Sequence, residues 1–127
     1  MRSPEEQEVL KTITTWNDHF ANNRTDEYFK FLSDDVTLFI GSSPYRIDGI
    51  IHDREEFEFA LNQGWTRVGY FQMLQMDIRV YGETAVATYH TRGGYGIEPK
   101  TVFVKETNVL VKQGKDWKIV HIHVSSV

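Results

Sequence analysis

The first part of the chain carries apolar residues spaced three or four positions apart, at Val9, Ile13, Trp16 and Phe20. Residues at this spacing share one face of a helix, so the pattern predicts an amphipathic helix with a buried stripe. Ser3 and Glu6 precede the stripe with the spacing of a capping box, and Pro4 occupies a position that helices accept at their start. We therefore expect the chain to open with a well-capped helix.

The rest of the pattern predicts two more helices and six strands. The helices are a short one at Thr25–Leu32 and one that a second capping box, Asp53 with Glu56, opens and Gly64 ends. The strands are expected at Val36–Ile40, Tyr45–Ile51, Val68–Val80, Thr84–Arg92, Thr101–Lys112 and Trp117–Ser126. The turn residues Gly41–Pro44 stop the first strand, and Gly93–Gly96 is interpreted as a flexible loop.

This order, in which helices are followed by a run of antiparallel strands, predicts a single α+β domain over residues 1–127. The late strands carry apolar residues on both faces. In 101–112, Val102, Val104 and Leu110 oppose Phe103, Val109 and Val111; in the last strand, Trp117 and Ile119 oppose Val120, Ile122 and Val124. The helices cover one face, and a second copy of the chain is expected to cover the other. This interpretation predicts a homodimer that Ile122→Asp dissociates.

Composition then narrows the function. The chain of 127 residues has no cysteine and a formal net charge of −4. These features exclude disulfides, a thiolate nucleophile and cysteine-bound metal, and they argue against nucleic-acid partners. No apolar run is long enough for a membrane span, and the acidic start is unlike a signal peptide, so we expect a cytoplasmic protein. No metal or organic cofactor is expected.

The candidate chemistry lies on the late strands. His121 and His123 alternate on one face together with Ser125, so they could serve as acid and base, bind an anion, or only satisfy polar groups of the sheet. Glu106 stands in an apolar strand, where burial would raise its pKa, although a glutamate paired with nearby Arg92 or Lys105 would also explain it. For the histidines and for Glu106, a functional role and a purely structural role both remain open at this point.

The order of elements resembles the cone-shaped α+β barrel of the nuclear transport factor 2-like superfamily, which includes SnoaL-like proteins, ketosteroid isomerase and scytalone dehydratase. The resemblance rests on the acidic turn Leu32–Thr37, on Gly49, and above all on the C-terminal residues. The latter match the association domain of calcium/calmodulin-dependent protein kinase at Glu106, Thr107, Val109, Trp117, Val120, His121, His123 and Ser125. A shared fold does not fix a shared function.

The resemblance also implies which activities to doubt. The catalytic aspartate of ketosteroid isomerase falls at Ile40 and its oxyanion tyrosine at Trp16, so that mechanism is not expected here. The pocket arginines of the kinase association domain fall at Asn108 and His90, which removes bidentate recognition of a carboxylate unless Arg92 restores a cation.

The sequence therefore predicts a SnoaL-like domain that binds a small organic molecule in the cone of a homodimer. A cofactor-independent isomerase, dehydratase or cyclase and a pure oligomerisation module remain as alternatives. The candidate acid–base residues are His90, Glu106 and His121. The candidate ligand-binding residues are Trp16, Tyr28, His90, Arg92, Asn108, His121 and His123. Of these, we expect the helix residues Trp16 and Tyr28 to close the cone, with His90, Asn108 and His121 supplying its polar groups.

Overall fold

A computed structural model describes residues 1–41 and 43–126, so Ser42 of the predicted turn and Val127 lie outside the described residues. The helices are α1 (Pro4–Ala21), α2 (Thr25–Phe29) and α3 (Ile50–Asn62). The strands are β1 (Leu32–Phe39), β2 (Ile47–Asp48), β3 (Thr66–Tyr81), β4 (Thr84–Gly96), β5 (Lys100–Gln113) and β6 (Asp116–Ser126). The α+β class predicted from the sequence is confirmed.

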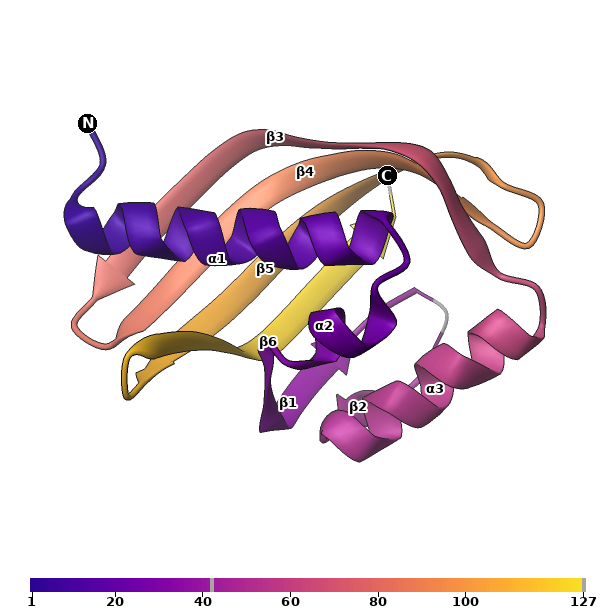
Figure 1. The fold of residues 1–127 in the computed structure, drawn as a ribbon, viewed down its shortest axis with the longest axis horizontal. Helices are drawn as coiled ribbons and strands as arrows, with labels where there is room; N and C mark the ends of the chain where they lie inside the picture. The colour runs from indigo at the N-terminus through magenta and orange to yellow at the C-terminus, as the bar shows by residue number, and fades with distance from the viewer. Residues whose placement is uncertain (42, 127) are drawn as a thin grey trace.

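The strands form one 6-stranded sheet in the order β2-β1-β6-β5-β4-β3. Neighbours are antiparallel except β1 and β6, which run parallel, so the sheet is mixed. The sheet curls strongly, and α1 lies across its concave face while α3 stands beside β1 and β2 (Figure 1). The helices and the curled sheet thus enclose an inner face, and none of the helices among the described residues lies on the convex face of the sheet.

The first helix begins as the sequence predicts. The backbone N–H of Glu6 donates to the Ser3 hydroxyl at 3.2 Å, and the backbone N–H of Ser3 donates to the Glu6 carboxylate at 2.8 Å. The predicted stripe contributes Val9, Ile13 and Trp16 to the core, and none of these three side chains is more than 2% exposed. Capping fixes where α1 starts, and the buried stripe fixes which face meets the sheet.

The predicted start of the third helix is wrong. The N-cap of α3 is Gly49, which has φ +89°, and no side chain caps the helix. The N–H of Asp53 donates to the Gly49 carbonyl at 3.0 Å, so Asp53 lies inside the first turn instead of capping it. Its carboxyl side chain is buried. The residue that the capping-box pattern identified as the helix cap is therefore a buried acid, three residues after the helix begins.

The predicted flexible loop Gly93–Gly96 is part of β4. A Cβ atom at Gly94 would lie 2.9 Å from Val68 Cγ2, and one at Gly93 would lie 3.0 Å from Phe71 Cδ2. The glycines therefore leave room for the side chains of Val68 and Phe71, their partners on β3 at an irregular point of the pairing, which is a packing role and not a flexible one.

The last strand departs from strict alternation. Leu110 pairs with Ile119, but the next residue of β5, Val109, pairs with His121, so Val120 is an extra residue in β6. This bulge inverts the alternation of side chains beyond it. Ile122 is therefore buried on the inner face like Ile119, contrary to the sequence-based expectation that it opposes Ile119.

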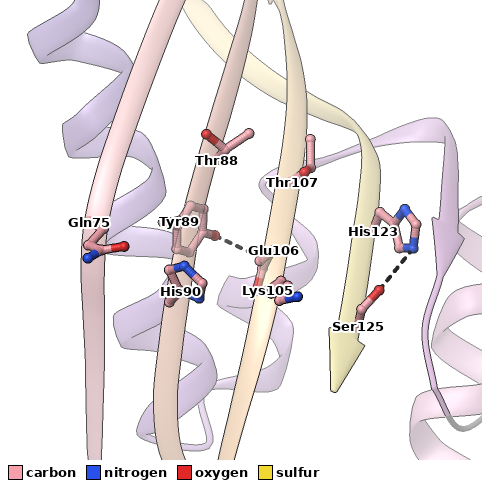
Figure 2. A pocket seen from close by; sticks show the side chains of 9 residues that line it. All are labelled: Gln75, Thr88, Tyr89, His90, Lys105, Glu106, Thr107, His123 and Ser125. Carbon is pink, nitrogen blue, oxygen red and sulfur yellow. Dashed lines mark hydrogen bonds between the residues drawn. The ribbon is translucent and has the colours of Figure 1, made fainter. Parts of the chain in front are cut away.

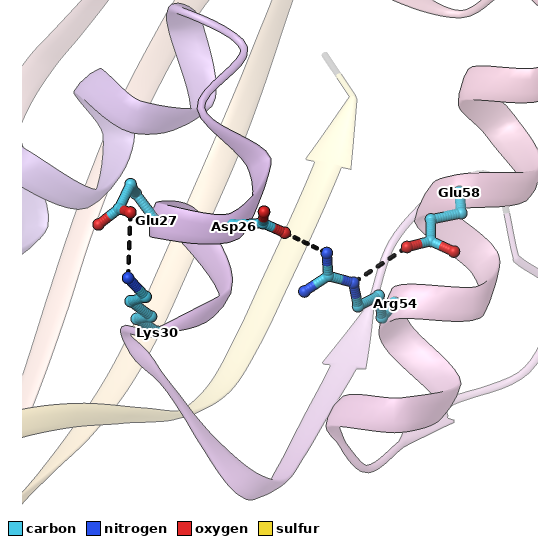
Figure 3. Close-up of polar contacts among 5 residues, drawn as sticks. All are labelled: Asp26, Glu27, Lys30, Arg54 and Glu58. Atoms are coloured by element: carbon cyan, nitrogen blue, oxygen red, sulfur yellow. Dashed lines mark hydrogen bonds and ion pairs between the residues drawn. The ribbon is translucent and has the colours of Figure 1, made fainter.

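Ion pairs between exposed side chains connect the helices at the wide end of the cone. Arg54 of α3 donates to Asp26 of α2 and, at 3.0 Å, to Glu58 one turn further along α3 (Figure 3). Lys30 and Glu27 form a second pair at 3.0 Å. Exposed pairs of this kind contribute less than about 1 kcal/mol each, so they orient α3 more than they stabilise it.

Candidate functional site

A polar cluster lies on the inner face of the sheet, where β4 and β5 are paired. The Tyr89 hydroxyl lies 2.9 Å from Glu106 Oε2 and 2.6 Å from Asn108 Oδ1, and Asn108 Nδ2 donates to Glu106 Oε2 at 3.0 Å. Asn17 of α1 completes the cluster by donating to the Tyr89 hydroxyl at 3.1 Å. All four side chains are buried. Glu106 is thus held by neutral partners and not by Arg92 or Lys105, the cations considered from the sequence.

The number of protons in this cluster indicates the charge of Glu106. The Tyr89 hydroxyl has one hydrogen and cannot donate to Glu106 and Asn108 at once. With a proton on Glu106, the carboxyl donates to Tyr89, Tyr89 donates to Asn108, and Asn108 donates back to Glu106, so each contact holds one hydrogen. Burial raises the pKa of Glu106, whereas the hydrogen bonds from Asn108 and Tyr89 oppose that rise. The geometry of the inner cluster therefore favours the protonated form of this buried carboxyl group.

A cluster of aromatic rings fills the inner face beside these polar groups and surrounds Arg67 at the start of β3. The guanidinium carbon lies 5.0 Å from the Phe20 ring centre, 5.1 Å from that of Phe57 and 5.3 Å from that of Trp65. Arg67 is 6% exposed, and burial lowers its pKa. Cation–π contacts offset part of the cost of burying this charge.

Three buried polar atoms around this cluster have no hydrogen-bond partner among the residues that the structure describes: Trp16 Nε1, Asp53 Oδ2 and Arg67 Nη1. Trp16 stacks on Tyr28 with ring centres 5.1 Å apart, and Tyr28 stacks on Phe57 at 5.8 Å. Burial, with the nearby carboxyl groups of Asp53 and Glu106, raises the pKa of Tyr28 well above its ordinary value. The unpartnered atoms therefore surround one aromatic centre, and buried polar atoms without partners are rare in folded proteins.

Asp53 and Arg67 were missed as site residues in the sequence. Burial raises the pKa of Asp53 to about 7, so its carboxyl changes charge near neutral pH. The sequence carried one signal that Asp53 could lie in the interior: it stands four residues before Phe57, so the two side chains share one face of the helix. The signal for Arg67 was that it is the single cation in the segment Trp65–Phe71, which is rich in aromatic residues.

A hollow of about 470 Å³ lies between α1 and β3 and reaches this interior from outside. Its lining includes Arg67 and Asn17, the two buried polar side chains that connect it to the aromatic centre and to the Tyr89–Glu106 cluster. The remaining lining residues are Thr14, Asp18, Ala21, Asn22, Asn23, Tyr70, Phe71 and Met73.

The other predicted site residues lie on the convex face. His90 pairs with Lys105, His121 with Val109 and His123 with Thr107, and all of these point away from the cone. His121 contacts the Thr37 hydroxyl at 2.7 Å, and its partial burial, followed by the nearby charge of His123, lowers its pKa. Arg92, two residues after His90 on β4, shares that outer face.

The expectation that His90, Asn108 and His121 converge on one cavity is therefore wrong. Tyr89 pairs with Glu106, so the inner residues of β4 are odd-numbered and those of β5 even-numbered, which puts Asn108 inside and His90 outside. His121 is outside because of the β6 bulge. Of the predicted ligand-binding residues, Trp16, Tyr28 and Asn108 lie on the inner side of the sheet. The other four, His90, Arg92, His121 and His123, lie on its outer face.

Within the described residues, no group of three or more His, Asp or Glu side chains could hold a metal ion. None of the helices among these residues has the length and apolar character needed to cross a membrane.

The helices on the concave face of a strongly curled mixed sheet define the nuclear transport factor 2-like fold. Residues 9–127 match the SnoaL-like domain family, and the chain belongs to that family. None of the curated proteins matches the chain in sequence.

Solved structures with the same fold come from proteins with different descriptions. The CaMKII hub of S. rosetta is 21% identical with a TM-score of 0.78, and the match covers 100% of both chains. An NTF2-like protein of unknown function from Pseudomonas putida KT2440 is 21% identical with a TM-score of 0.84, covering 98% of this chain and 88% of that one. A ketosteroid isomerase-like protein from Erwinia carotovora atroseptica SCRI1043 is 12% identical with a TM-score of 0.84, covering 99% and 98%. At these identities the likeness shows the fold alone.

Proposed function

We propose that this SnoaL-like domain binds a small organic molecule, with a planar apolar part and hydrogen-bonding groups, at the aromatic centre of the cone. The observation that carries the proposal is the set of unpartnered buried atoms, Trp16 Nε1, Asp53 Oδ2 and Arg67 Nη1. An unsatisfied buried donor or acceptor costs about 1–3 kcal/mol, and a ligand that supplies partners to all three removes that cost. Two donors and one carboxyl favour a ligand with acceptor oxygens, such as a small aromatic carboxylate.

A thermal-shift screen of small carboxylates and planar ring compounds tests this proposal. A ligand at a hundred times its dissociation constant stabilises the fold by roughly 2.7 kcal/mol. Trp16→Phe removes the indole N–H and keeps the stacked ring, so we expect it to weaken binding of the hits by about tenfold.

Trp117→Phe is the matched control, because Trp117 is equally buried but its Nε1 contacts Glu8, at 3.4 Å, away from the aromatic centre. Hits whose affinity falls equally in both tryptophan variants, or in neither, would contradict a site at Trp16.

Catalysis in the same cone is a second candidate function, favoured by two carboxyl groups of opposite character. Burial raises the pKa of Glu106 and so favours its acid form, whereas Asp53 has a pKa of about 7, near the value that suits a general base at neutral pH. These groups replace His90 and His121 as candidates for a cofactor-independent isomerase, dehydratase or cyclase, because both histidines face outward. A hit that is chemically converted by the wild type, but only bound by Asp53→Asn, would support this function.

Self-association through the convex face remains a proposal as well. Phe39, Leu74 and Phe103 are exposed on that face by 44%, 40% and 48%, and no helix in the described part of the chain covers the sheet there. Light scattering at micromolar concentration is expected to give about twice 14.8 kDa. Phe103→Asp places a charge in the contact without touching the core, and should give a folded monomer. A monomeric wild type would rule out this pairing.

A further inference from the structure

A second, separate hollow of about 320 Å³ lies on the convex face, over β4, β5 and β6 (Figure 2). Strand pairing arranges its side chains in two rows that run across the sheet. One row is His90, Lys105 and Ser125, and the other is Thr88, Thr107 and His123. Every one of these six side chains can donate a hydrogen bond, and three can carry positive charge.

The charge of this outer hollow is opposite to that of the whole chain, which has a net charge of −4. Tyr89 and Glu106 border the hollow, but their side chains point to the inner face, where they bond to each other. The outward acid nearest in register, Asp77 opposite Thr88, is paired with Arg79 at 3.1 Å. The described lining of the hollow therefore contains cations and no outward carboxylate to neutralise them. Lys105, directly opposite His90, is therefore the fixed positive charge of the described lining.

A strained residue completes the hollow. The pairing of β3 with β4 shifts between Leu74 and Asp77, so two residues of β3 oppose Tyr89 alone. Gln75 in this bulge has φ +54°, a conformation that residues with side chains rarely adopt. The bulge turns the Gln75 carboxamide toward the hollow beside His90. Strain of this kind persists where the surrounding structure enforces it, and it is concentrated at functional sites.

We propose that this outer hollow binds a phosphate group, either as inorganic phosphate or as the phosphate of a small monoester. Tetrahedral oxyanions accept several hydrogen bonds at once, and the lining offers the ammonium of Lys105, two imidazoles, three hydroxyls and one carboxamide. Of these groups, the His123 ring and the Ser125 hydroxyl are hydrogen-bonded to each other at 3.2 Å (Figure 2). The exposed Leu74 and Phe103 flank these rows in register and offer apolar surface to the organic part of an ester. This proposal does not depend on a ligand in the cone.

Titrations with inorganic phosphate and with phenyl phosphate test it, at an ionic strength held constant with sodium chloride so that screening is equal throughout. They are run at a protein concentration where light scattering gives a single species, since the same face is proposed to pair two copies. The proposal predicts saturable binding of one anion per chain, followed by calorimetry. The ring-proton NMR signals of His90 and His123 should shift, while those of His19 and His52 on the helices stay in place.

Lys105→Gln is expected to weaken binding about tenfold, since a hydrogen bond to a charged group is worth roughly 1.5–3 kcal/mol. Lys100→Gln, on the same strand outside the hollow, is the matched control and should leave the affinity unchanged. Tighter binding of phenyl phosphate would identify a monoester as the ligand class, and equal binding would identify the free anion; both support the site. No saturable binding by either compound, or equal losses in both lysine variants, would overturn it.

Discussion

The Ile122→Asp variant is expected to be largely unfolded at neutral pH instead of folding as a dissociated monomer. Ile122 is 2% exposed on the inner face, where its strand partners are Asn108 of β5 and Leu38 of β1. Burying an unpaired carboxylate at such a position costs at least about 4 kcal/mol, against a total stability of about 5–15 kcal/mol for a typical domain, and the cavity and strain around a polar side chain add to this cost. Far-ultraviolet circular dichroism and urea denaturation measure the loss.

His123→Asp is the control for this experiment, because His123 is the next residue in β6 to face outward and is exposed. It should keep a cooperative unfolding transition at nearly the wild-type midpoint. If Ile122→Asp folds and His123→Asp does not, the bulge at Val120 has been placed wrongly and the alternation in β6 is the regular one.

A pH-dependent loss of stability is the second large effect that we expect, and Asp53 is its main source. The pKa of Asp53 is about 7 in the folded chain against 3.8 as its ordinary value. Between those values the folded chain holds a proton that the unfolded chain has released, so rising pH favours unfolding. From about pH 5 to about pH 8 this group removes about 3 kcal/mol of stability, and above pH 7 its effect levels off.

Asp53→Asn should therefore be more stable than wild type at about pH 8, and the difference should shrink toward about pH 5. Glu106 contributes with the same sign and His121, whose pKa is lowered, with the opposite sign, but both are present in the two proteins and cancel in the comparison. Urea denaturation across this pH range measures the difference. Asp116→Asn, at the exposed start of β6, is the matched control and should follow the wild type at every pH. A difference independent of pH would show that Asp53 does not titrate in this range.

Patterns among neighbouring residues in the sequence predicted the parts of the fold that depend on short-range spacing. Spacing identified α1 and its buried stripe, and alternation identified both faces of β5, because these depend on residues close together in the chain. The parallel pairing of β1 with β6 joins residues such as Thr37 and His121, which lie far apart in sequence, and only the folded chain reveals it.

The site was harder to predict, because its residues depend on where single-residue irregularities fall. One extra residue in β6 turned His121 outward and Ile122 inward, and neither carries a sequence mark of a bulge. The position of Asp53 depended on whether α3 begins at Ile50 or three residues later. Glu106 was identified from its apolar strand, and Asn108 from the resemblance to the kinase association domain. Arg67, in contrast, became visible only when rings from α1, α3 and β3 were seen around it.

The alternation of inward and outward side chains along β4 and β5 determines which amino-acid substitutions these strands tolerate. The inner cluster and the outer hollow use adjacent residues, Tyr89 beside His90 and Glu106 beside Lys105, so a single strand layer separates two environments. Tolerance of substitution along these strands must then alternate with a period of two residues: inner positions accept only close replacements, and outer ones accept most polar residues. In β6 the phase of that alternation reverses at Val120. One selection experiment on folding would thus record, residue by residue, which face of the sheet each position belongs to.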